Sequence, residues 1–310
     1  MTLSQKPLVV LLMGPTASGK TTFSLDLAEA LQTEIISVDS ALVYREMNIG
    51  TAKPSLAERS RLTHHLIDII DPSLSFSTGQ FRDQAMPLIE TLLAQNKIPL
   101  LTGGTMLYFK ALTEGLAQLP PGNPEIRALL EQQMQVDGKQ AMHQRLQQID
   151  PESAARIHMN DPQRIQRALE VYAITGQPLS SFFKQQHESP YRFLKIILSP
   201  TDRSVLHRRI EQRFHTMLND GLIEEVMQLR NRGDLDLSMP AMRSVGYRQV
   251  WQYLQGDIKF PEMIDQSIFA SRQLAKRQLT WLRKIEDAIW LDHAQNQLPA
   301  VLASINALLG

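Results

Sequence analysis

Eight consecutive residues near the N-terminus have the types and spacing of a phosphate-binding loop. Gly14-Pro15-Thr16-Ala17-Ser18-Gly19-Lys20-Thr21 fits the pattern G-x-x-x-x-G-K-[ST] and lies between an apolar run and a helical pattern. In such a loop, backbone N–H groups at a helix N-terminus point toward phosphate oxygens, and the lysine adds a full positive charge. The Thr21 hydroxyl can bind a Mg²⁺ that bridges phosphates. The motif therefore predicts a site for a diphosphate or triphosphate together with Mg²⁺.

A carboxylate follows the next apolar run. Asp39 comes directly after Glu34-Ile35-Ile36-Ser37-Val38, and in a parallel sheet the end of that strand opens toward the same crevice as the phosphate loop. Asp39 is thus a candidate general base or metal partner. The alternative is an aspartate that caps a turn, and both roles are compatible with its place in the sequence.

The other motifs of motor and switch NTPases are missing from the sequence. An acidic residue would end a Walker-B strand, but the run Ile98-Pro99-Leu100-Leu101-Thr102 is followed by Gly103-Gly104-Thr105. The guanine-specific motif N-K-x-D is absent as well, because Asn96-Lys97-Ile98-Pro99 has no aspartate. The phosphate loop indicates phosphate binding, and it does not by itself imply that ATP is hydrolysed.

Short apolar runs without alternation predict the strands that position these groups. They occupy residues 8–13, 34–38, 65–70, 98–102, 193–198 and 288–291. Runs of this kind are typical of strands that are covered on both faces. Helical patterns at 22–31 and 78–95 lie between the early strands, which predicts an α/β fold with a parallel sheet and right-handed crossovers.

A stretch without strand signals interrupts this core. After about Leu119 the chain is typical of polar helices. Asp161-Pro162 predicts an N-cap followed by proline at the first helical position, in a helix that runs through Tyr172 and ends near Gly176. We therefore expect a P-loop NTPase-like core formed by residues 1–115 and 193–310, with a helical insertion domain at residues 116–192.

The C-terminal third contributes further helices, and the last of them is basic. They are expected at about residues 202–214, 221–230 and 263–284. In the third helix Arg272, Lys276 and Arg283 share a face, and Arg277 and Lys284 add to the positive charge. Such a helix is typical either of a solvated surface or of a contact with a polyanion.

Composition excludes several classes of function. The 310 residues are 43% apolar and contain 32 basic and 32 acidic side chains, so a nucleic-acid partner would need a local positive patch. Because there is no cysteine, disulfides, thiolate metal sites and cysteine nucleophiles are excluded. The N-terminal apolar run is too short for a signal peptide or a membrane span, so we expect a cytoplasmic protein with no membrane partner.

The acids near His64-His65, Asp68 and Asp71, are better explained by packing and capping than by a metal site.

Several blocks of the sequence together resemble a known family, the bacterial tRNA dimethylallyltransferases or tRNA isopentenyltransferases. The blocks follow in family order from residue 14 to about residue 284, which is nearly the whole chain. They are Gly14–Thr21, Ser37–Tyr44, Ile49–Pro54, Gly103–Tyr108, Asn160–Glu170, Arg209–Phe214, Ser244–Gln249 and Gln273–Gln278.

The resemblance implies a prenyl transfer reaction. In this family the dimethylallyl group of dimethylallyl diphosphate passes to N6 of the adenosine just 3′ of the anticodon, with Mg²⁺ and without consumption of ATP. The phosphate loop would then hold the departing diphosphate. The implied partners are the tRNA anticodon stem-loop and dimethylallyl diphosphate; the family suggests a monomer with no obligate protein partner.

The resemblance also implies roles for particular residues. Asp39 matches the proposed base, Thr21 the metal ligand, and Arg213, with Arg164 as a second candidate, the guanidinium that stabilises the leaving group. The diphosphate would lie on Gly14, Pro15, Thr16, Ala17, Ser18, Gly19, Lys20, Thr21 and Arg213. The tRNA would contact Asp39, Ser40, Ala41, Leu42, Thr105, Arg127, Gln163, Arg164, Ile165, Gln166, Arg167, Arg243, Ser244, Val245, Gly246, Tyr247 and Arg248.

Two other functions share part of this pattern. A P-loop nucleoside or nucleotide kinase would have the phosphate loop and an acid after the second strand, but it would not need the helical insertion or the basic helix. A non-catalytic RNA-binding module would need neither Lys20 nor the Thr21 hydroxyl. The transferase accounts for all of these features.

Overall fold

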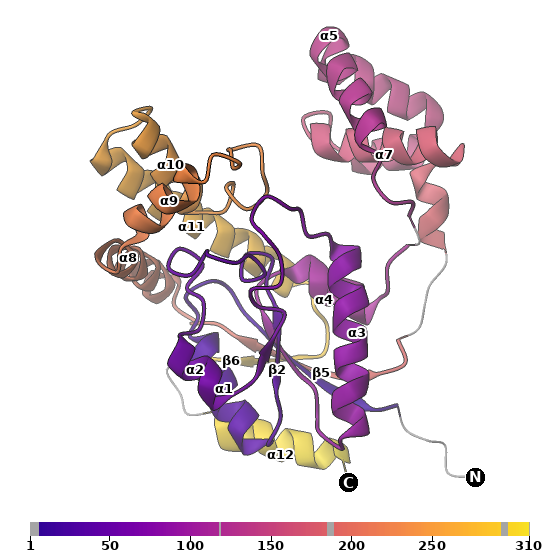
Figure 1. Cartoon of the computed structure of the whole chain (residues 1–310). Coiled ribbons are helices and arrows are strands. Elements are labelled where there is room, and N and C mark those ends of the chain that lie inside the picture. The colour runs from indigo at the N-terminus through magenta and orange to yellow at the C-terminus, as the bar shows by residue number, and fades with distance from the viewer. Residues whose placement is uncertain (1–5, 118, 185–188, 293–296, 310) are drawn as a thin grey trace, which may run out of the picture. The chain divides into compact units, whose positions relative to one another are not determined.

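Six parallel strands form one sheet in the part of the chain that the structure, a computed structural model, describes: residues 6–117, 119–184, 189–292 and 297–309. The strand order is β3-β2-β4-β1-β5-β6. Figure 1 shows the core of the protein with β2, β5 and β6 of this sheet labelled. The strands are β1 (Leu8–Met13), β2 (Ile35–Val38), β3 (His64–His65), β4 (Leu100–Gly103), β5 (Arg192–Leu198) and β6 (Ala288–Leu291). The predicted α/β fold with a parallel sheet is confirmed.

One predicted strand is much shorter than its apolar run. The run at residues 65–70 predicted a full strand, but only His64 and His65 pair with β2. Leu66 and Asp68 have φ of 62° and 57°, a left-handed conformation that turns the chain away from the sheet. Asp68 is held there by Lys53 Nζ and Arg59 Nη1, both at 2.5 Å. The prediction of a strand at this place was therefore wrong beyond its first residue.

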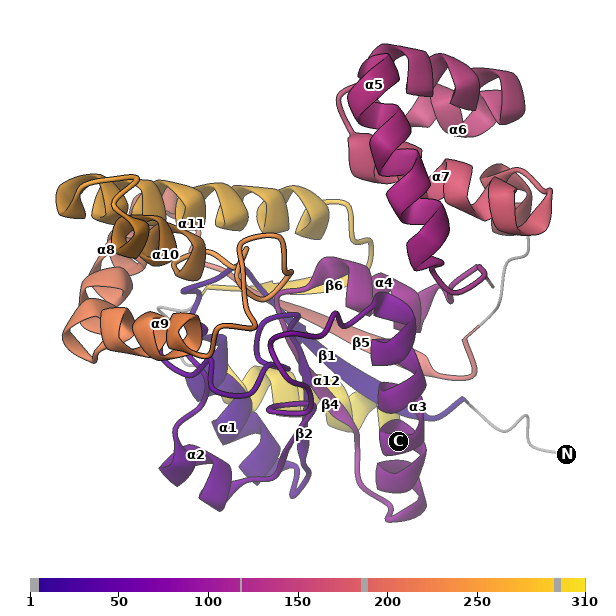
Figure 2. The same ribbon diagram turned by 45° about the horizontal axis from the view of Figure 1, so that its top comes forward.

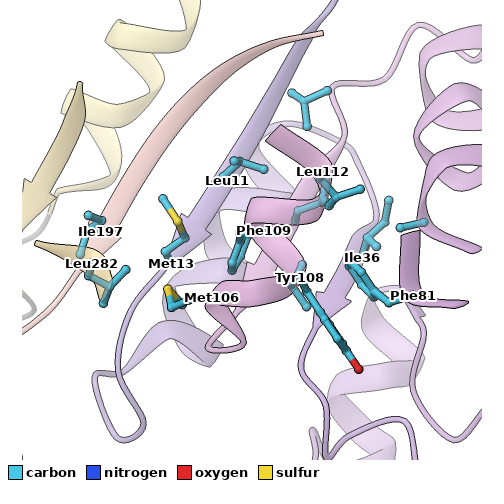
Figure 3. Close-up of a cluster of buried hydrophobic side chains, with 14 of the residues drawn as sticks. Leu11, Met13, Ile36, Phe81, Met106, Tyr108, Phe109, Leu112, Ile197 and Leu282 are labelled. Carbon is cyan, nitrogen blue, oxygen red and sulfur yellow. The ribbon is translucent and has the colours of Figure 1, made fainter. Parts of the chain in front are cut away.

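Continuous apolar strands are explained by helices on both faces of the sheet. On one face Leu12, Ile35 and Leu100 pack against α1 (Lys20–Ala30) and α12 (Leu298–Leu309). On the other face Leu11 and Ile36 join a cluster with α3 (Thr78–Ala94) and α4 (Met106–Thr113). Figure 3 shows this second cluster, in which the Phe81 and Tyr108 rings stack with centroids 4.2 Å apart.

Four helices form a separate hydrophobic cluster beside the carboxyl ends of the strands (Figure 2). They are α8 (Arg203–Asn219), α9 (Leu222–Asn231), α10 (Tyr247–Gln255) and α11 (Phe260–Leu282). The loop after β2 packs into this cluster through Val43, Tyr44 and Met47. Trp251 is buried in it as well. The short helix α2 (Leu56–Arg61) follows that loop.

The chain divides into two compact units, which we call the core unit (Met1–Thr113 and Ser189–Gly310) and the helical unit (Glu114–Glu188). The helical unit holds α5 (Pro124–Ile149), α6 (Pro151–Arg156), α7 (Pro162–Thr175) and η1 (Leu179–Lys184) around its own apolar cluster. Helix α7 begins and ends as predicted, because Asp161 accepts a hydrogen bond from Arg164 N and Gly176 adopts φ of 70°.

Among the helices of the described segments, none combines the length and the hydropathy of a transmembrane segment.

Candidate active site

The phosphate loop joins β1 to α1, and its two motif glycines are required by the backbone. A Cβ on Gly14 would lie 2.3 Å from the carbonyl oxygen of Leu198, and Gly19 has φ of 94°. Gly19 is also the N-cap of α1, so the loop ends where the helix dipole favours an anion. The structure thus places residues 14–21 as the motif predicts.

Side chains from distant helices hold this loop. Gln278 of α11 accepts a hydrogen bond from Thr16 N (2.8 Å) and donates one to Gly104 O (2.9 Å). Arg209 of α8 donates to Ser18 O (3.4 Å). Sequence reasoning assigned no role to Gln278 or Arg209, although both lie in blocks that carry the family resemblance. The spacing along the chain could not reveal these contacts, because they are made across the fold.

A cavity of about 200 Å³ lies at the phosphate loop. Phosphate-loop, strand-end and helix residues meet there; among them are Thr16, Ala17, Lys20, Thr21, Asp39, Ala41, Leu42, Gly104, Arg213, Ser244, Val245, Gly246 and Gln278. Lys20, Thr21 and Arg213 also line an adjoining opening with Arg209. The predicted phosphate, base and guanidinium groups are therefore brought together in the core unit.

Burial lowers the pKa values of the two cationic side chains in this cavity. Burial lowers the pKa of Lys20 to about 8, although Asp39 opposes the shift, and the positive charge of Arg213 lowers it further. Burial also lowers the pKa of Arg213, again against the effect of Asp39. Two cations held close together in a poorly hydrated site favour the binding of an anion. The site is thus poised for a polyanionic group.

Asp39 caps a turn and also faces the cavity. Its Oδ1 accepts hydrogen bonds from Ala41 N (2.8 Å) and Leu42 N (3.4 Å), so it caps the turn after β2. Its carboxylate also lines the cavity. Oδ2 makes no hydrogen bond with any residue of the described segments, which leaves this oxygen for a ligand.

The ends of β2 and β4 are tied together next to Asp39. Ser40 N donates to Thr105 Oγ1 (3.0 Å), and Thr105 Oγ1 donates to Ser40 Oγ (3.2 Å). Thr105 N in turn donates to Val38 O (3.2 Å). Ser40 and Thr105, both predicted to contact RNA, therefore form one polar edge beside the cavity.

A buried carboxylate holds the loop that lines the cavity at Gly50. Glu225 of α9 accepts hydrogen bonds from Asn48 N, Ile49 N and Gly50 N at 2.8 to 3.2 Å, and from the Tyr247 hydroxyl at 2.5 Å. Tyr247 is fully buried, and burial, with the negative charge of Glu225, raises its pKa. Tyr247 is among the residues predicted to contact the tRNA, and because its side chain is buried, such a contact would involve its backbone. Its neighbours Arg243 and Arg248 are exposed.

In the helical unit, the predicted RNA-binding residues of α7 divide into exposed and buried ones. Gln163 and Arg164 are exposed, but Ile165 is fully buried in the cluster of this unit. The Ile165 side chain cannot contact RNA, because it packs inward. Gln166 Nε2 donates to Arg127 O (2.9 Å) and so joins α7 to α5.

Two further arginines of the helical unit share a buried carboxylate. Arg127 Nε donates to Glu170 Oε1 (2.8 Å), and Arg167 Nη1 donates to Glu170 Oε2 (2.5 Å). Arg167 Nη2 also donates to Pro120 O (2.7 Å). Glu170 is fully buried, whereas the Arg127 side chain is 52% exposed. Glu170 was missed as an organising residue, because a glutamate in a polar helix has no distinctive sequence signal.

Histidine and aspartate side chains of residues 64–71 form ion pairs within the core unit. His65 pairs with Glu34, Asp68 with Lys53 and Arg59, and Asp71 with Arg232. In residues 6–117, 119–184, 189–292 and 297–309 no group of three or more His, Cys, Asp or Glu side chains could hold a metal ion.

The cavity fits a Mg²⁺ that comes with its phosphate ligand. Mg²⁺ binds oxygen ligands, keeps several waters and is usually held by one or two carboxylates together with substrate phosphates. The Thr21 hydroxyl and the Asp39 carboxylate line the cavity and supply oxygen ligands of this kind. These residues thus fit a metal that is shared with a bound diphosphate.

Comparison with known proteins gives consistent results. The family model described as IPP transferase matches residues 42–285. The chain is 53% identical over 294 residues to the tRNA dimethylallyltransferase of Methylococcus capsulatus, with 94% of each chain covered. It is 56% identical over 289 residues to the protein of the same name from Nitrosococcus oceani, with 93% of this chain and 92% of that one covered.

Solved structures of tRNA-modifying transferases are similar to this chain as well. The crystal structure of the tRNA isopentenylpyrophosphate transferase of Bacillus halodurans matches with a TM-score of 0.72 and 39% identity, over 99% of this chain and 96% of that one. The structure of a eukaryotic dimethylallyltransferase acting on tRNA matches with a TM-score of 0.83 and 27% identity, over 96% of this chain and 78% of that one. The resemblance carried by the sequence motifs is confirmed. The relatives are transferases, which argues against the kinase and binding-module alternatives. The chain belongs to the IPP transferase family, the family of tRNA dimethylallyltransferases.

Proposed function

We propose that this enzyme transfers the dimethylallyl group of dimethylallyl diphosphate to the exocyclic N6 of the adenosine immediately 3′ of the tRNA anticodon, and releases diphosphate. The observation that supports this most directly is the cavity that combines the phosphate loop, Arg213 and Asp39. An alkyl transfer needs these three parts: a cradle for the leaving group, positive charge, and a base.

The cations of the cavity stabilise the leaving group. As the reaction proceeds, the bond between the first carbon of the dimethylallyl group and its bridging phosphate oxygen breaks, and a bond between that carbon and N6 forms. Negative charge therefore grows on the diphosphate. Lys20 and Arg213 line the cavity, where fixed positive charge in a poorly hydrated site is most effective. A bound diphosphate would keep Lys20 protonated above its lowered pKa of about 8.

Asp39 receives the proton that N6 loses. An adenine amine is a poor nucleophile because its lone pair is delocalised into the ring. A carboxylate that accepts one of its hydrogens raises its reactivity as the new bond forms. Asp39 Oδ1 is occupied by the N–H groups of Ala41 and Leu42, so Oδ2 is the oxygen that would accept this proton.

Thr21 would hold a Mg²⁺ together with diphosphate oxygens. When bound, this ion would supply charge that neutralises the departing diphosphate. Thr21 is exposed in the first turn of α1, so its hydroxyl group is accessible to such a shared ion.

The target base has to leave the anticodon loop before N6 can reach the cavity. A base that is unstacked and turned outward is read by contacts along its edge and by stacking. Asp39 to Leu42 and Thr105 lie beside the cavity and would contact this base or its neighbours. The exposed residues Arg243 and Arg248, with Gln163 and Arg164 of the helical unit, would hold the anticodon stem-loop. Because tRNA is a cytoplasmic substrate, we place the activity in the cytoplasm.

Mass spectrometry of tRNA tests the proposal. An unmodified tRNA with an A-rich anticodon loop is incubated with the protein, Mg²⁺ and dimethylallyl diphosphate, without ATP. We expect one C₅H₈ gain on the adenosine 3′ of the anticodon. A tRNA with guanosine at that position is the control and should gain nothing. ATP turnover with a nucleoside or nucleotide acceptor, and no mass gain on tRNA, would contradict the proposal and favour a kinase.

A further inference from the structure

Two buried hydroxyl groups of the cavity have no role in the reaction described above. Ser37 Oγ and Thr102 Oγ1 are buried, and among the described residues neither has a hydrogen-bond partner. Both residues line the cavity at the phosphate loop. A buried hydroxyl without a partner is unfavourable, and in a native structure it indicates a bound water, ion or ligand group.

The two hydroxyl groups are neighbours on the same face of the sheet. Ser37 of β2 and Thr102 of β4 are paired in register. Along their strands they alternate with residues of the other face, so they share a face with Ile35 and Leu100, which pack against α1. They therefore lie on the α1 side of the sheet, at the carboxyl ends of the strands.

The first turn of α1 lines the same cavity. Thr21 and Ser24 line the cavity together with Ser37 and Thr102. In motor and switch NTPases the P-loop hydroxyl and a Walker-B aspartate together hold Mg²⁺. Here Thr102 and Gly103 end β4, where such a strand would end in an acid.

We infer that Ser37 and Thr102 bind water ligands of the Mg²⁺ that Thr21 shares with the diphosphate. They are positioning residues, because they would act on the metal through its waters. Mg²⁺ gives up its waters reluctantly and usually keeps several of them. A hydroxyl group both donates and accepts, so it suits a metal-bound water. This inference rests on the Mg²⁺ site of the proposed function.

Hydroxyl groups in place of acidic side chains should lower the affinity of the protein for Mg²⁺ in the absence of diphosphate. Asp39 is the one acidic residue among the described residues that line the cavity. With so little negative charge, the protein alone holds Mg²⁺ weakly, and the metal is bound mainly when diphosphate is present. Mg²⁺ and diphosphate should therefore strengthen each other's binding, and the two hydroxyl groups should contribute to that coupling.

Calorimetry of diphosphate binding tests this inference. The affinity for inorganic diphosphate is measured with and without Mg²⁺ in the wild type, in Ser37→Ala, in Thr102→Val and in the double variant. Thr33→Val is the matched control, because Thr33 is buried like Ser37 but its hydroxyl group donates to Ile98 O (2.7 Å), just before β2 begins. Thr102→Ser keeps a hydroxyl group and tests rescue.

We expect the Mg²⁺-dependent gain in affinity to fall by about tenfold in the double variant. Binding without Mg²⁺ should not change. The melting temperature of the metal-free double variant should lie about 2–4 °C above that of the metal-free wild type, because two unsatisfied buried hydroxyl groups are removed. Thr33→Val should lower the melting temperature and leave the gain intact. Thr102→Ser should behave as the wild type.

Two results would overturn the inference, and they differ in what else they affect. If the wild type shows the Mg²⁺-dependent gain and the double variant keeps it, the hydroxyl groups do not act on the metal, and the proposed function is unaffected. If the wild type shows no gain, the Mg²⁺ site of the proposed function fails together with the inference. The C₅H₈ gain on tRNA then decides separately whether the transfer itself takes place.

Discussion

The core unit and the helical unit each contain a buried carboxylate, and the two carboxylates have different partners. Glu225 in the core unit accepts hydrogen bonds from three backbone N–H groups and from Tyr247. Glu170 in the helical unit accepts from the guanidinium groups of Arg127 and Arg167, and from Asn123 N. The first carboxylate shapes a loop, whereas the second orients positive charge.

This difference indicates how the two units divide the work. In the core unit the charged groups lie in a cavity, where burial lowers the pKa values of Lys20 and Arg213. In the helical unit the arginines are paired and partly exposed, as suits contact with a polyanion. Changes to the charged groups of the core-unit cavity should therefore affect the chemical step, and changes to the paired arginines of the helical unit should affect the affinity for tRNA.

The largest effect is expected from Asp39→Ala in the core unit. Loss of a positioned general base lowers kcat by about 10²–10⁴-fold, while the KM for tRNA should change little. Single-turnover kinetics at saturating tRNA measures the effect. Asp26→Ala is the control, because Asp26 is an exposed carboxylate of α1. Loss of tRNA binding with the chemical step preserved would show that Asp39 acts in recognition and would remove the distinction between the units.

The corresponding change in the helical unit is Glu170→Gln. It leaves two guanidinium groups without an anionic partner, which should destabilise this unit by about 3 kcal/mol, at the low end for a buried pair because Arg127 is half-exposed. Less well oriented arginines should raise the KM for tRNA by about tenfold, with kcat at saturation unchanged.

Hydrogen exchange of α5 and α7 and steady-state kinetics measure the two effects of Glu170→Gln. Glu125→Gln, at an exposed position of α5, is the matched control. Burial alone would raise the pKa of Glu170, but hydrogen bonds from Arg167 and Arg127 outweigh it and lower the pKa. The contribution of Glu170 to stability is therefore present above the ordinary pKa of a glutamate, and it is lost only as the pH falls through the lowered value. A lower kcat with unchanged KM would contradict the division of work.

The sequence predicted the parts of the site that depend on local backbone requirements. The glycines and Lys20 of the phosphate loop, Asp39 at the end of a strand, and the capped helix α7 all follow from short-range patterns, and the structure has them as predicted. Arg213 was identified only through the resemblance to a family. Its place in the cavity depends on how α8 packs, which no local pattern reveals.

The contacts that hold the site were not predictable in the same way. Gln278 reaches Thr16 across 262 residues, and Glu225 reaches the loop at Ile49 across 176 residues. Tyr247 and Ile165 lie in segments that match the family, but burial of their side chains depends on tertiary packing. A block that matches the family therefore identifies a region of the site, and only the fold separates the residues that face a ligand from those that support them.

The affinity of the core unit for diphosphate should depend on pH through Lys20. Because the pKa of Lys20 is lowered to about 8, Lys20 is charged below this pH and loses its charge as the pH rises. Diphosphate favours the charged form, so its affinity should fall by about tenfold between pH 7 and pH 9. Calorimetry in two buffers of different ionisation enthalpy should show proton uptake near pH 8. Lys20→Arg keeps its charge over this range and corrects for the titration of diphosphate itself. An equal pH dependence in both proteins would show that Lys20 does not titrate there.

The smallest effect is expected from Arg164→Ala in the helical unit. Its side chain is 69% exposed and pairs with Asp161 at 3.3 Å, and an exposed pair of this kind contributes little to stability. The melting temperature should therefore stay the same. If Arg164 neutralises one phosphate of the anticodon stem-loop, the slope of log affinity against log salt should fall by about 0.7–0.9, and affinity at physiological salt by a few fold. Arg156→Ala, at an exposed position of α6 that pairs with Glu152, is the control and should leave the slope unchanged. A lower kcat with an unchanged salt slope would assign Arg164 to the leaving group, and the separation of chemistry and tRNA affinity between the two units would then not hold at this position.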